Sequence, residues 1–211
     1  MTAIISSHRR LWAVALVFVT LTLVYVLLIR PWHLRWGASD AELVMSLPGD
    51  SLLPEDSIVS TRALTIHAPA SEVWLWLNQI GQERAGFYSY DWLENLFLAR
   101  MNNADRIVPE LQGLQVGDRV SYMGDGPEGT YAHVDMIEPG RYFSMGGWTF
   151  SLQPVDGQTT RFIVRYPSPG IKTLGDRLYY YPIFEPAHFV MESGMMMGIK
   201  HRAESAFRGG L

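Results

Sequence analysis

The chain has 211 residues, of which 48% are hydrophobic, and this proportion is typical of folded proteins and excludes wholesale disorder. It has no cysteine, which excludes disulfides, thiolate zinc sites and a thiol nucleophile. The first 30 residues carry three arginines and no acid, so the other 181 residues carry 14 basic and 21 acidic side chains. Residues 31–211, which we call the body, therefore carry an excess of negative charge that repels phosphate backbones, and we expect no nucleic acid among the partners of this protein.

An uncharged run of 19 residues, Leu11–Ile29, follows a short tail. As a helix this run is roughly 28 Å long, close to the thickness of a bilayer's hydrocarbon core. Trp12 and Trp32 stand at its two ends, where indole rings favour the headgroup region. A signal peptide is the alternative, but its apolar core is usually about 7–15 residues long and a small-x-small cleavage site follows it. We therefore predict a tail over residues 1–10, a single transmembrane helix over 11–30, and the lipid bilayer of the cell membrane as a partner.

The charges that flank this run bear on its orientation. Arg9 and Arg10 on the ten-residue tail favour a cytoplasmic N-terminus, which places the body outside the cytoplasm. Arg30 and Arg35 on the other flank nearly balance that pair. Because short basic tails translocate poorly, the count leans to an extracytoplasmic body, and the side of the membrane stays open.

Residues 31–57 are predicted to form a juxtamembrane linker ahead of a domain over residues 58–211. The second part of this segment, 37–57, contains five acids and two prolines but no Lys or Arg, which is typical of a polar tether. A short helix is expected near Ala41–Met45.

The domain begins with one predicted strand and two predicted helices. Alternating residues predict a strand over Ile58–His67, with Leu64 and Ile66 on one face. Apolar residues at steps of three and four predict a well-buried helix over Glu72–Ile80. A second helix is expected over about Trp92–Met101.

The hydrophobic period changes to two after residue 117, which predicts an antiparallel sheet with one wet face. Residues 167–184 contain three prolines and predict an irregular stretch, and a long last helix is expected over about Pro186–Phe207. The strands are predicted near Asp118–Met123, Thr130–Glu138, Tyr142–Met145, Trp148–Val155 and Thr160–Tyr166.

This order of elements excludes a doubly wound parallel sheet, since parallel crossovers need strands and helices in alternation. The compact alternative is an α+β helix-grip fold, in which a curved antiparallel sheet wraps the long C-terminal helix, here preceded by one transmembrane helix. The chain resembles the START-like or Bet v 1-like superfamily, also called SRPBCC, which includes polyketide cyclase/dehydrase-like proteins. The resemblance covers about residues 58–207 and indicates a fold more specifically than a reaction. It rests on ALTIHAPASEVWLWLNQIG (Ala63–Gly81), GFYSYDWLENL (Gly86–Leu96), ADRIVPELQGLQVGDRV (Ala104–Val120) and MESGMMMGIKHRAE (Met191–Glu204).

The resemblance implies a cavity between the sheet and the last helix that takes an apolar small molecule. A sheet curved around one helix also leaves space that large side chains or a ligand must fill. Tyr88 and Tyr90 can gate the mouth of such a cavity, or they can clamp their loop to the sheet. The candidate ligand-binding residues are Tyr88, Tyr90, Asp91, Trp92, Trp148, Glu192, Met195 and Met196, and no catalytic residue is assigned.

Glu192 falls on the apolar stripe of the last helix, three residues after Phe189 and four before Met196. A carboxylate there must find a cation, accept hydrogen bonds or have its pKa raised. It can act as a general acid–base group or bind the polar head of a ligand. The plainer alternative, which we favour, is that Glu192 reaches solvent or pairs with Arg84 or Arg165.

Two glycine patterns and two histidine–acid pairs complete the sequence analysis. Gly194 and Gly198 are expected to let the sheet or a ligand approach the backbone of the last helix. Residues 124–129 fit the string G-x-G-x-x-G, but they carry two acids and no helix follows, so they predict a hairpin turn. The pairs of His133 with Asp135 and His188 with Glu192 are too small for a metal site, and we expect neither a metal nor a cofactor.

The favoured hypothesis is membrane-anchored binding or transport of a hydrophobic, lipid-like small molecule. One alternative is a cyclase- or dehydratase-type enzyme in which Glu192 and Tyr88 or Tyr90 transfer protons. The other is a protein-interaction module whose cavity is filled. An enzyme ranks below binding because no strong catalytic constellation is present. A pocket of roughly 300–1,000 Å³ favours the first two hypotheses, whereas a filled core with an exposed apolar patch favours the third.

Overall fold

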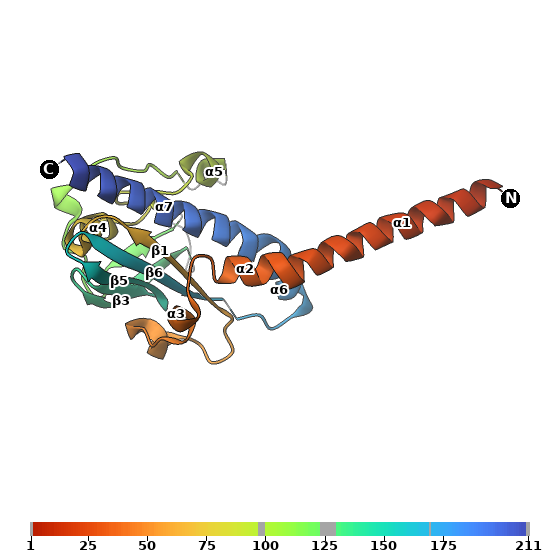
Figure 1. Ribbon diagram of the computed structural model, residues 1–211, viewed down its shortest axis with the longest axis horizontal. Coiled ribbons are helices and arrows are strands. Elements are labelled where there is room, and N and C mark those ends of the chain that lie inside the picture. The colour runs from red at the N-terminus through yellow and green to blue at the C-terminus, as the bar shows by residue number, and fades with distance from the viewer. Residues whose placement is uncertain (1, 97–99, 123–129, 169, 210–211) are drawn as a thin grey trace.

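A computed structural model describes residues 2–96, 100–122, 130–168 and 170–209 of the chain. A domain of mixed helices and sheet carries one long helix that projects away from it (Figure 1). The turn predicted for residues 124–129 lies outside the described residues. So do the last residue of the strand predicted near Asp118–Met123 and part of the helix predicted over about Trp92–Met101.

Six strands form one antiparallel sheet in the order β1-β6-β5-β4-β3-β2. Register shifts in β3 and β5 mark irregularities that bend the sheet around the helix on its inner face. Every strand that the sequence predicts is present, with bounds that differ by at most two residues. The strands are β1 (Val59–Ile66), β2 (Arg119–Ser121), β3 (Tyr131–Glu138), β4 (Tyr142–Met145), β5 (Trp148–Asp156) and β6 (Thr159–Pro167).

The long last helix α7 (Glu185–Gly209) lies along one face of this sheet, together with α4 (Ala70–Leu77) (Figure 1). The core lies between these helices and the sheet, and its large side chains are almost completely buried. Phe143, Phe150, Phe162, Met195, Met196 and Ile199 are each at most 1% exposed. An antiparallel sheet with a long C-terminal helix is the α+β helix-grip arrangement, so the predicted fold class is confirmed.

The segment predicted as a linker is packed against the outer face of the sheet. The packed part contains α3 (Asp40–Val44) and a 3-10 helix (Pro48–Leu52), whereas α2 (Arg30–Leu34), where the segment begins, lies beside β1 and α7. Two of its acids meet arginines of β6: Arg161 Nε lies 2.6 Å from Glu42 Oε1, and Arg165 Nη1 lies 2.7 Å from Asp50 Oδ2. The expectation of a free polar tether does not hold for this part of the segment, because two of its five acids pair with cations more than a hundred residues away. The same packing buries part of the face that was expected to be wet.

The stretch predicted to be irregular, residues 167–184, contains helix α6 (Leu174–Tyr179) and a π-helix, η4 (Tyr180–Phe184), which leads directly into α7. The helix begins with a capping box in which the Thr173 hydroxyl accepts from the Asp176 N–H and the Asp176 carboxylate accepts from the Thr173 N–H. The three prolines in this stretch favoured an irregular structure. The T-x-x-D pattern of Thr173 and Asp176, which is typical of a capping box, was the signal that could have predicted the helix.

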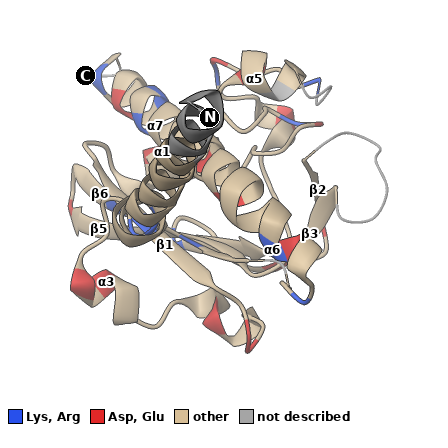
Figure 2. Cartoon of the chain, turned by 90° about the vertical axis from the view of Figure 1, so that its right-hand side faces the viewer, with Lys and Arg blue, Asp and Glu red and all other residues tan. Residues whose placement is uncertain are grey.

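The projecting helix comprises α1 (Thr2–Val24) and a π-helix, η1 (Tyr25–Ile29), and continues into α2. Within it, Trp12–Leu34 is the candidate membrane span; its most apolar window of 18 residues has a mean hydropathy of 2.6, and none of that window is buried. Figure 2 looks along α1, and the part of its ribbon drawn in tan holds no Lys, Arg, Asp or Glu, in agreement with the uncharged sequence of residues 12–24. In the described part of the chain, this is the one helix that is long and apolar enough to cross a membrane.

Candidate functional site

Glu192 lies on the inner face of α7 and forms a buried ion pair with Arg62 of β1. Arg62 Nη1 is 2.6 Å from Glu192 Oε1, and the two side chains are 1% and 0% exposed. The partner is neither of the arginines considered from the sequence, because Arg84 donates to backbone carbonyls and Arg165 pairs with an acid on the outer face. Arg62 shares its strand face with the core residues Leu64 and Ile66, and this alternation was the signal that could have identified it.

Arg62 is held by two further contacts. Its Nε donates to the backbone carbonyl of His33 over 2.8 Å, and its guanidinium lies 5.2 Å from the ring centre of Phe189. These contacts spread the buried positive charge over a carboxylate, a carbonyl dipole and a ring face. Glu192 is less well satisfied, because its Oε2 has no hydrogen-bond partner among the residues that the structure describes.

His188 lies one turn before Glu192, and its Nε2 is 3.9 Å from Glu192 Oε2, too far for a hydrogen bond. Burial lowers the pKa of His188 to about 4, and the nearby Arg62 adds to this shift while Glu192 opposes it. The imidazole is therefore neutral near pH 7. Because the His188 imidazole is neutral, it does not supply a cationic partner for Glu192 Oε2.

His188 is also the centre of an aromatic cluster, which we define as Trp148, Tyr166, Tyr180, Phe184 and His188. Its ring stacks on Tyr166 with 4.0 Å between centroids, and it lies 5.5 Å from Trp148 and 5.7 Å from Phe184. Trp148 Nε1 is buried and lacks a hydrogen-bond partner within the described ranges. Two unpaired polar atoms, one donor and one acceptor, thus lie on residues that both adjoin His188.

A pocket of about 240 Å³ lies on the outer side of this aromatic cluster. Tyr180 and Phe184 belong both to the pocket wall and to the cluster, and their rings are 5.5 Å apart. The remaining wall comes from α6 and the segment before it, through Gly170, Ile171, Asp176 and Tyr179. The two shared rings therefore separate the pocket from His188 and Glu192.

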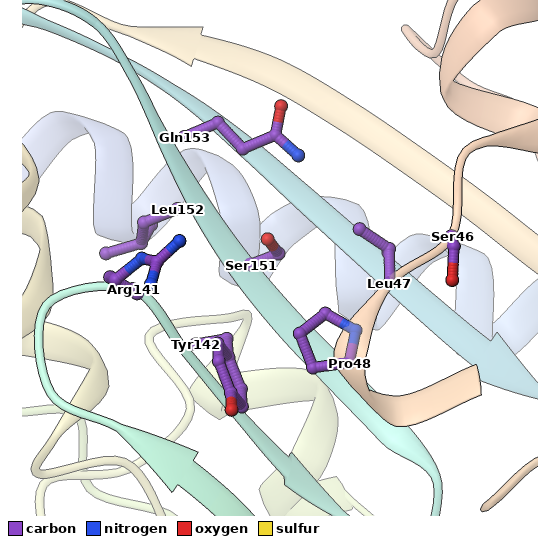
Figure 3. Close-up of a pocket in the computed structure, with 8 residues that line it drawn as sticks. All are labelled: Ser46, Leu47, Pro48, Arg141, Tyr142, Ser151, Leu152 and Gln153. Carbon is purple, nitrogen blue, oxygen red and sulfur yellow. The ribbon is translucent and has the colours of Figure 1, made fainter. Parts of the chain in front are cut away.

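A second pocket, of about 260 Å³, lies on the opposite face of the sheet from α7 (Figure 3). It is bounded by Ser46–Pro48 and by side chains of β4 and β5 with the turn before β4: Arg141, Tyr142, Ser151, Leu152 and Gln153. Neither pocket occupies the space between α7 and the sheet. Core side chains such as Phe143, Phe150 and Met196 are fully buried in that space, where the resemblance implies a cavity.

Met195 and Met196 lie in the same space. They are 1% and 0% exposed and pack in the same core cluster as the phenylalanines of the sheet. Unbranched thioether side chains adapt their shape at small energetic cost. They are therefore well suited to yield space to a ligand.

Tyr88 is a core residue that packs against a part of α7 distant from Glu192. Its hydroxyl donates to the Trp76 carbonyl and accepts from Gln79 Nε2, and burial raises its pKa to about 12. Its ring carries the Arg202 guanidinium at 4.9 Å, ten residues beyond Glu192 and thus roughly 15 Å along the helix axis.

Tyr88 belongs to the loop of residues 86–92, and the residues that follow it in this loop lie at the surface. Tyr90 and Trp92 are 45% and 68% exposed, and Asp91 is exposed at the start of α5 (Asp91–Leu96). Four other predicted site residues, Trp148, Glu192, Met195 and Met196, lie in the interior, and the first two of them adjoin His188. The loop residues are not brought to that place.

Gly194 and Gly198 let the loop, rather than the sheet, approach α7. A Cβ at Gly194 would lie 2.7 Å from the Tyr90 ring, and one at Gly198 would overlap the Tyr88 carbonyl. Tyr88 itself has a φ of 60°, an unusual value for a residue other than glycine. The Tyr88 N–H donates to Asn103 Oδ1 over 2.6 Å, which helps to hold this conformation.

The projecting helix is fixed to the domain next to the aromatic cluster, a contact that the sequence did not reveal. Arg30 donates twice to the buried Glu185, from Nε over 2.8 Å and from Nη2 over 3.0 Å. The Tyr25 hydroxyl donates to the Tyr181 carbonyl over 2.9 Å. Glu185 directs its own N–H to Tyr180, and residue 186 is a proline without an N–H, so the Tyr181 carbonyl accepts from the side chain.

Comparison with solved structures finds several distantly similar proteins. A crystal structure of a protein from Nitrosomonas europaea is 13% identical with a TM-score of 0.42, over 76% of this chain and 99% of that one. A protein of unknown function from Staphylococcus aureus is 10% identical with a TM-score of 0.40, over 74% and 99%. A protein from Corynebacterium glutamicum described as polyketide-cyclase-like is 17% identical with a TM-score of 0.31, over 74% and 92%. No family model and no curated protein matches the chain. These values carry no residue role from one protein to another.

Proposed function

We propose that this chain is a membrane-anchored helix-grip domain that binds an apolar small molecule with one polar group. The observation that carries the proposal is the pair of unpaired polar atoms beside His188, Glu192 Oε2 and Trp148 Nε1. A buried polar atom without a partner costs about 1–3 kcal/mol. A ligand hydroxyl can donate to the carboxylate oxygen, and a ligand oxygen can accept from the indole N–H, which would remove these penalties.

The surroundings of these two atoms suit an apolar ligand body. Aromatic rings of Tyr166, Phe184 and Trp148 line them, and Met195 and Met196 lie in the adjoining core. Entry requires Tyr180 and Phe184 to move away from the pocket that they border. Both residues belong to a π-helix, a conformation that occurs frequently at functional sites. The ligand reaches the interior from the end of the domain that adjoins the projecting helix.

Membrane anchoring is consistent with the binding of an apolar ligand. Apolar ligands partition into the bilayer, and a tethered domain meets them at high effective concentration. The span Trp12–Leu34 ends where Arg30 pairs with Glu185, one turn of helix before His188. The ligand entrance is therefore held next to the membrane.

A reaction on the bound molecule is the second candidate. It is favoured by the 3.9 Å separation between Glu192 Oε2 and His188 Nε2, which places two titratable groups side by side, within reach of the same ligand group. Tyr88 is unsuited to the proton transfer considered from the sequence, since its hydroxyl is fully engaged at the other end of the core.

The test is ligand capture by the full chain in nanodiscs of a synthetic lipid. Protein is incubated with a cellular lipid extract, washed and extracted, and the released compounds are identified by mass spectrometry. Wild-type protein is expected to enrich one chemical class, and Glu192→Gln and Trp148→Phe are each expected to lose it. Glu204→Gln is the matched control, because Glu204 is a mostly buried acid on the same helix that pairs with Lys200.

Two results would contradict the proposal. One is that wild-type protein enriches nothing over empty nanodiscs. The other is that all variants retain the same compound as the wild type. Trp148→Phe removes the indole donor without removing a charge, so the test does not depend on the stability of the ion pair. Conversion of the captured compound during prolonged incubation would support the second candidate.

A further inference from the structure

The geometry points to a second membrane contact, in which an apolar ridge of the domain inserts into the boundary between headgroups and acyl chains. The ridge consists of Leu174, Leu178, Tyr179 and Ile183, on α6 and the π-helix that follows it. The inference rests on the membrane anchoring in the proposed function. The occupant of this surface is the lipid of the bilayer that the projecting helix spans.

Exposure is the first argument. Leu174, Leu178, Tyr179 and Ile183 are 72%, 65%, 58% and 58% exposed, although they lie within ten residues of one another. Single exposed apolar residues are ordinary on protein surfaces, but a contiguous group of large ones marks an interaction site. Burying such a group in acyl chains gains roughly 25 cal/mol for each Å² of apolar surface.

Depth is the second argument, and it identifies the occupant. Tyr25 lies four residues before Ile29, the end of the uncharged run, and is therefore roughly 6 Å inside the apolar layer. The hydrogen bond from its hydroxyl to the Tyr181 carbonyl holds the π-helix at the same depth. Interfacial helices lie about 5–10 Å into the boundary between headgroups and acyl chains. The ridge is thus carried to the depth at which apolar side chains meet lipid.

Rigidity is the third argument. The bidentate contact of Arg30 with the buried Glu185 fixes the direction of the projecting helix, and the Arg30 guanidinium also lies 5.0 Å from the Tyr181 ring centre. In Figure 1, α6 lies at the end of the domain from which α1 projects. The domain therefore cannot turn the ridge toward water while these contacts persist.

Charge is the fourth argument. Lys172 and Arg177 are exposed on the same segment, whereas Asp176 is engaged in the helix cap. Cations beside an apolar surface at this depth meet lipid phosphates. The pocket bordered by Tyr179, Tyr180 and Phe184 lies against this ridge. A ligand therefore enters this pocket from the bilayer rather than from water.

The experiment uses the absence of cysteine from the chain, which allows one labelling site at a time. Leu178→Cys carries an environment-sensitive fluorophore in the full chain, reconstituted in vesicles of phosphatidylcholine with phosphatidylglycerol. Lipids with a spin label high or low on the acyl chain serve as quenchers of known depth. Val155→Cys is the matched control on the domain. Val155 is 64% exposed and lies near the end of β5 that is opposite to Trp148 and the aromatic cluster. Val17→Cys reports the span itself.

We expect the Leu178 label to lose about half of its emission to the shallow quencher and less to the deep one, as an interfacial position does. We expect the Val155 label to keep its emission with either quencher. Replacing Leu174 by Asp is expected to weaken the quenching at Leu178, while far-UV circular dichroism stays unchanged.

Two outcomes would overturn the inference, and they are distinguishable. If the Val17 label is quenched and the Leu178 label is not, the ridge faces water and only the second contact is wrong. If neither label is quenched, the chain is not anchored through its apolar helix, and the membrane part of the proposed function fails with it.

Discussion

Arg62 of the first strand and Glu192 of the last helix form an ion pair of 2.6 Å whose two side chains are almost completely buried. The pair joins two elements that lie 130 residues apart in sequence. The His33 carbonyl, which accepts from Arg62, adds the junction with the projecting helix to the same network. The sheet, the gripping helix and the membrane-proximal segment are thereby held at one point.

Removing one member of this pair should be far more damaging than removing both. Arg62→Met leaves a buried carboxylate without its cation and is expected to lower the free energy of unfolding by about 3–5 kcal/mol. Adding Glu192→Met should restore most of that loss, because the site is otherwise apolar. Chemical denaturation in detergent measures the double-mutant cycle. The exposed pair of Arg141 with Glu138 is the control, and Arg141→Met should change stability by less than about 1 kcal/mol.

His188 should make stability depend on pH between about 4 and 6.5. Burial lowers its pKa in the folded protein to about 4 from the ordinary value of 6.5, so the unfolded chain binds the proton more readily. Stability is therefore complete above about pH 6.5 and falls by up to about 3 kcal/mol as the pH decreases toward 4. Thermal unfolding followed against pH measures this. His188→Gln should lessen this fall without abolishing it, because the buried His33 remains in the variant, whereas His201→Gln, at an exposed position on the same helix, should leave the fall unchanged.

Glu42 should hold the membrane-proximal segment on the sheet through its contact with Arg161. That contact lowers the pKa of Glu42 to about 2 from 4.5, so its contribution is present above about pH 4.5 and is lost as the pH falls toward 2. Glu42→Gln is expected to remove roughly 2 kcal/mol of stability at neutral pH. It should also make residues 37–57 more sensitive to limited proteolysis. Asp40→Asn, at an exposed position two residues earlier, should do neither; equal sensitivity in both variants would show that Glu42 does not hold the segment.

Gly198 should tolerate no larger residue. A Cβ there overlaps the carbonyl of Tyr88, which is already held at a positive φ, so Gly198→Ala is expected to destabilise the domain by about 1–3 kcal/mol. Gly175→Ala is the control in α6, where the added Cβ meets its nearest neighbour at an ordinary 3.6 Å. That change should be neutral or stabilise by up to about 1 kcal/mol. A stabilising Gly198→Ala would mean that the loop lies farther from α7.

The sequence determined the elements whose signals are local. The uncharged run Leu11–Ile29, the alternation in β5 and β6 and the apolar stripe of α7 each repeat within one element, so the helix-grip order followed from them. Glu192 was recognisable as a carboxylate on an apolar stripe for the same reason.

Only the tertiary structure decided how these elements meet. The partner of Glu192, the burial of side chains beneath α7 and the packing of residues 31–57 on the sheet all depend on strand register and on contacts across more than a hundred residues. Arg62, Arg161 and Arg165 are alike in sequence, since each is an arginine within a strand. Their different partners follow from the face of the sheet on which each one lies, and that face acquires its meaning only when the helices have packed.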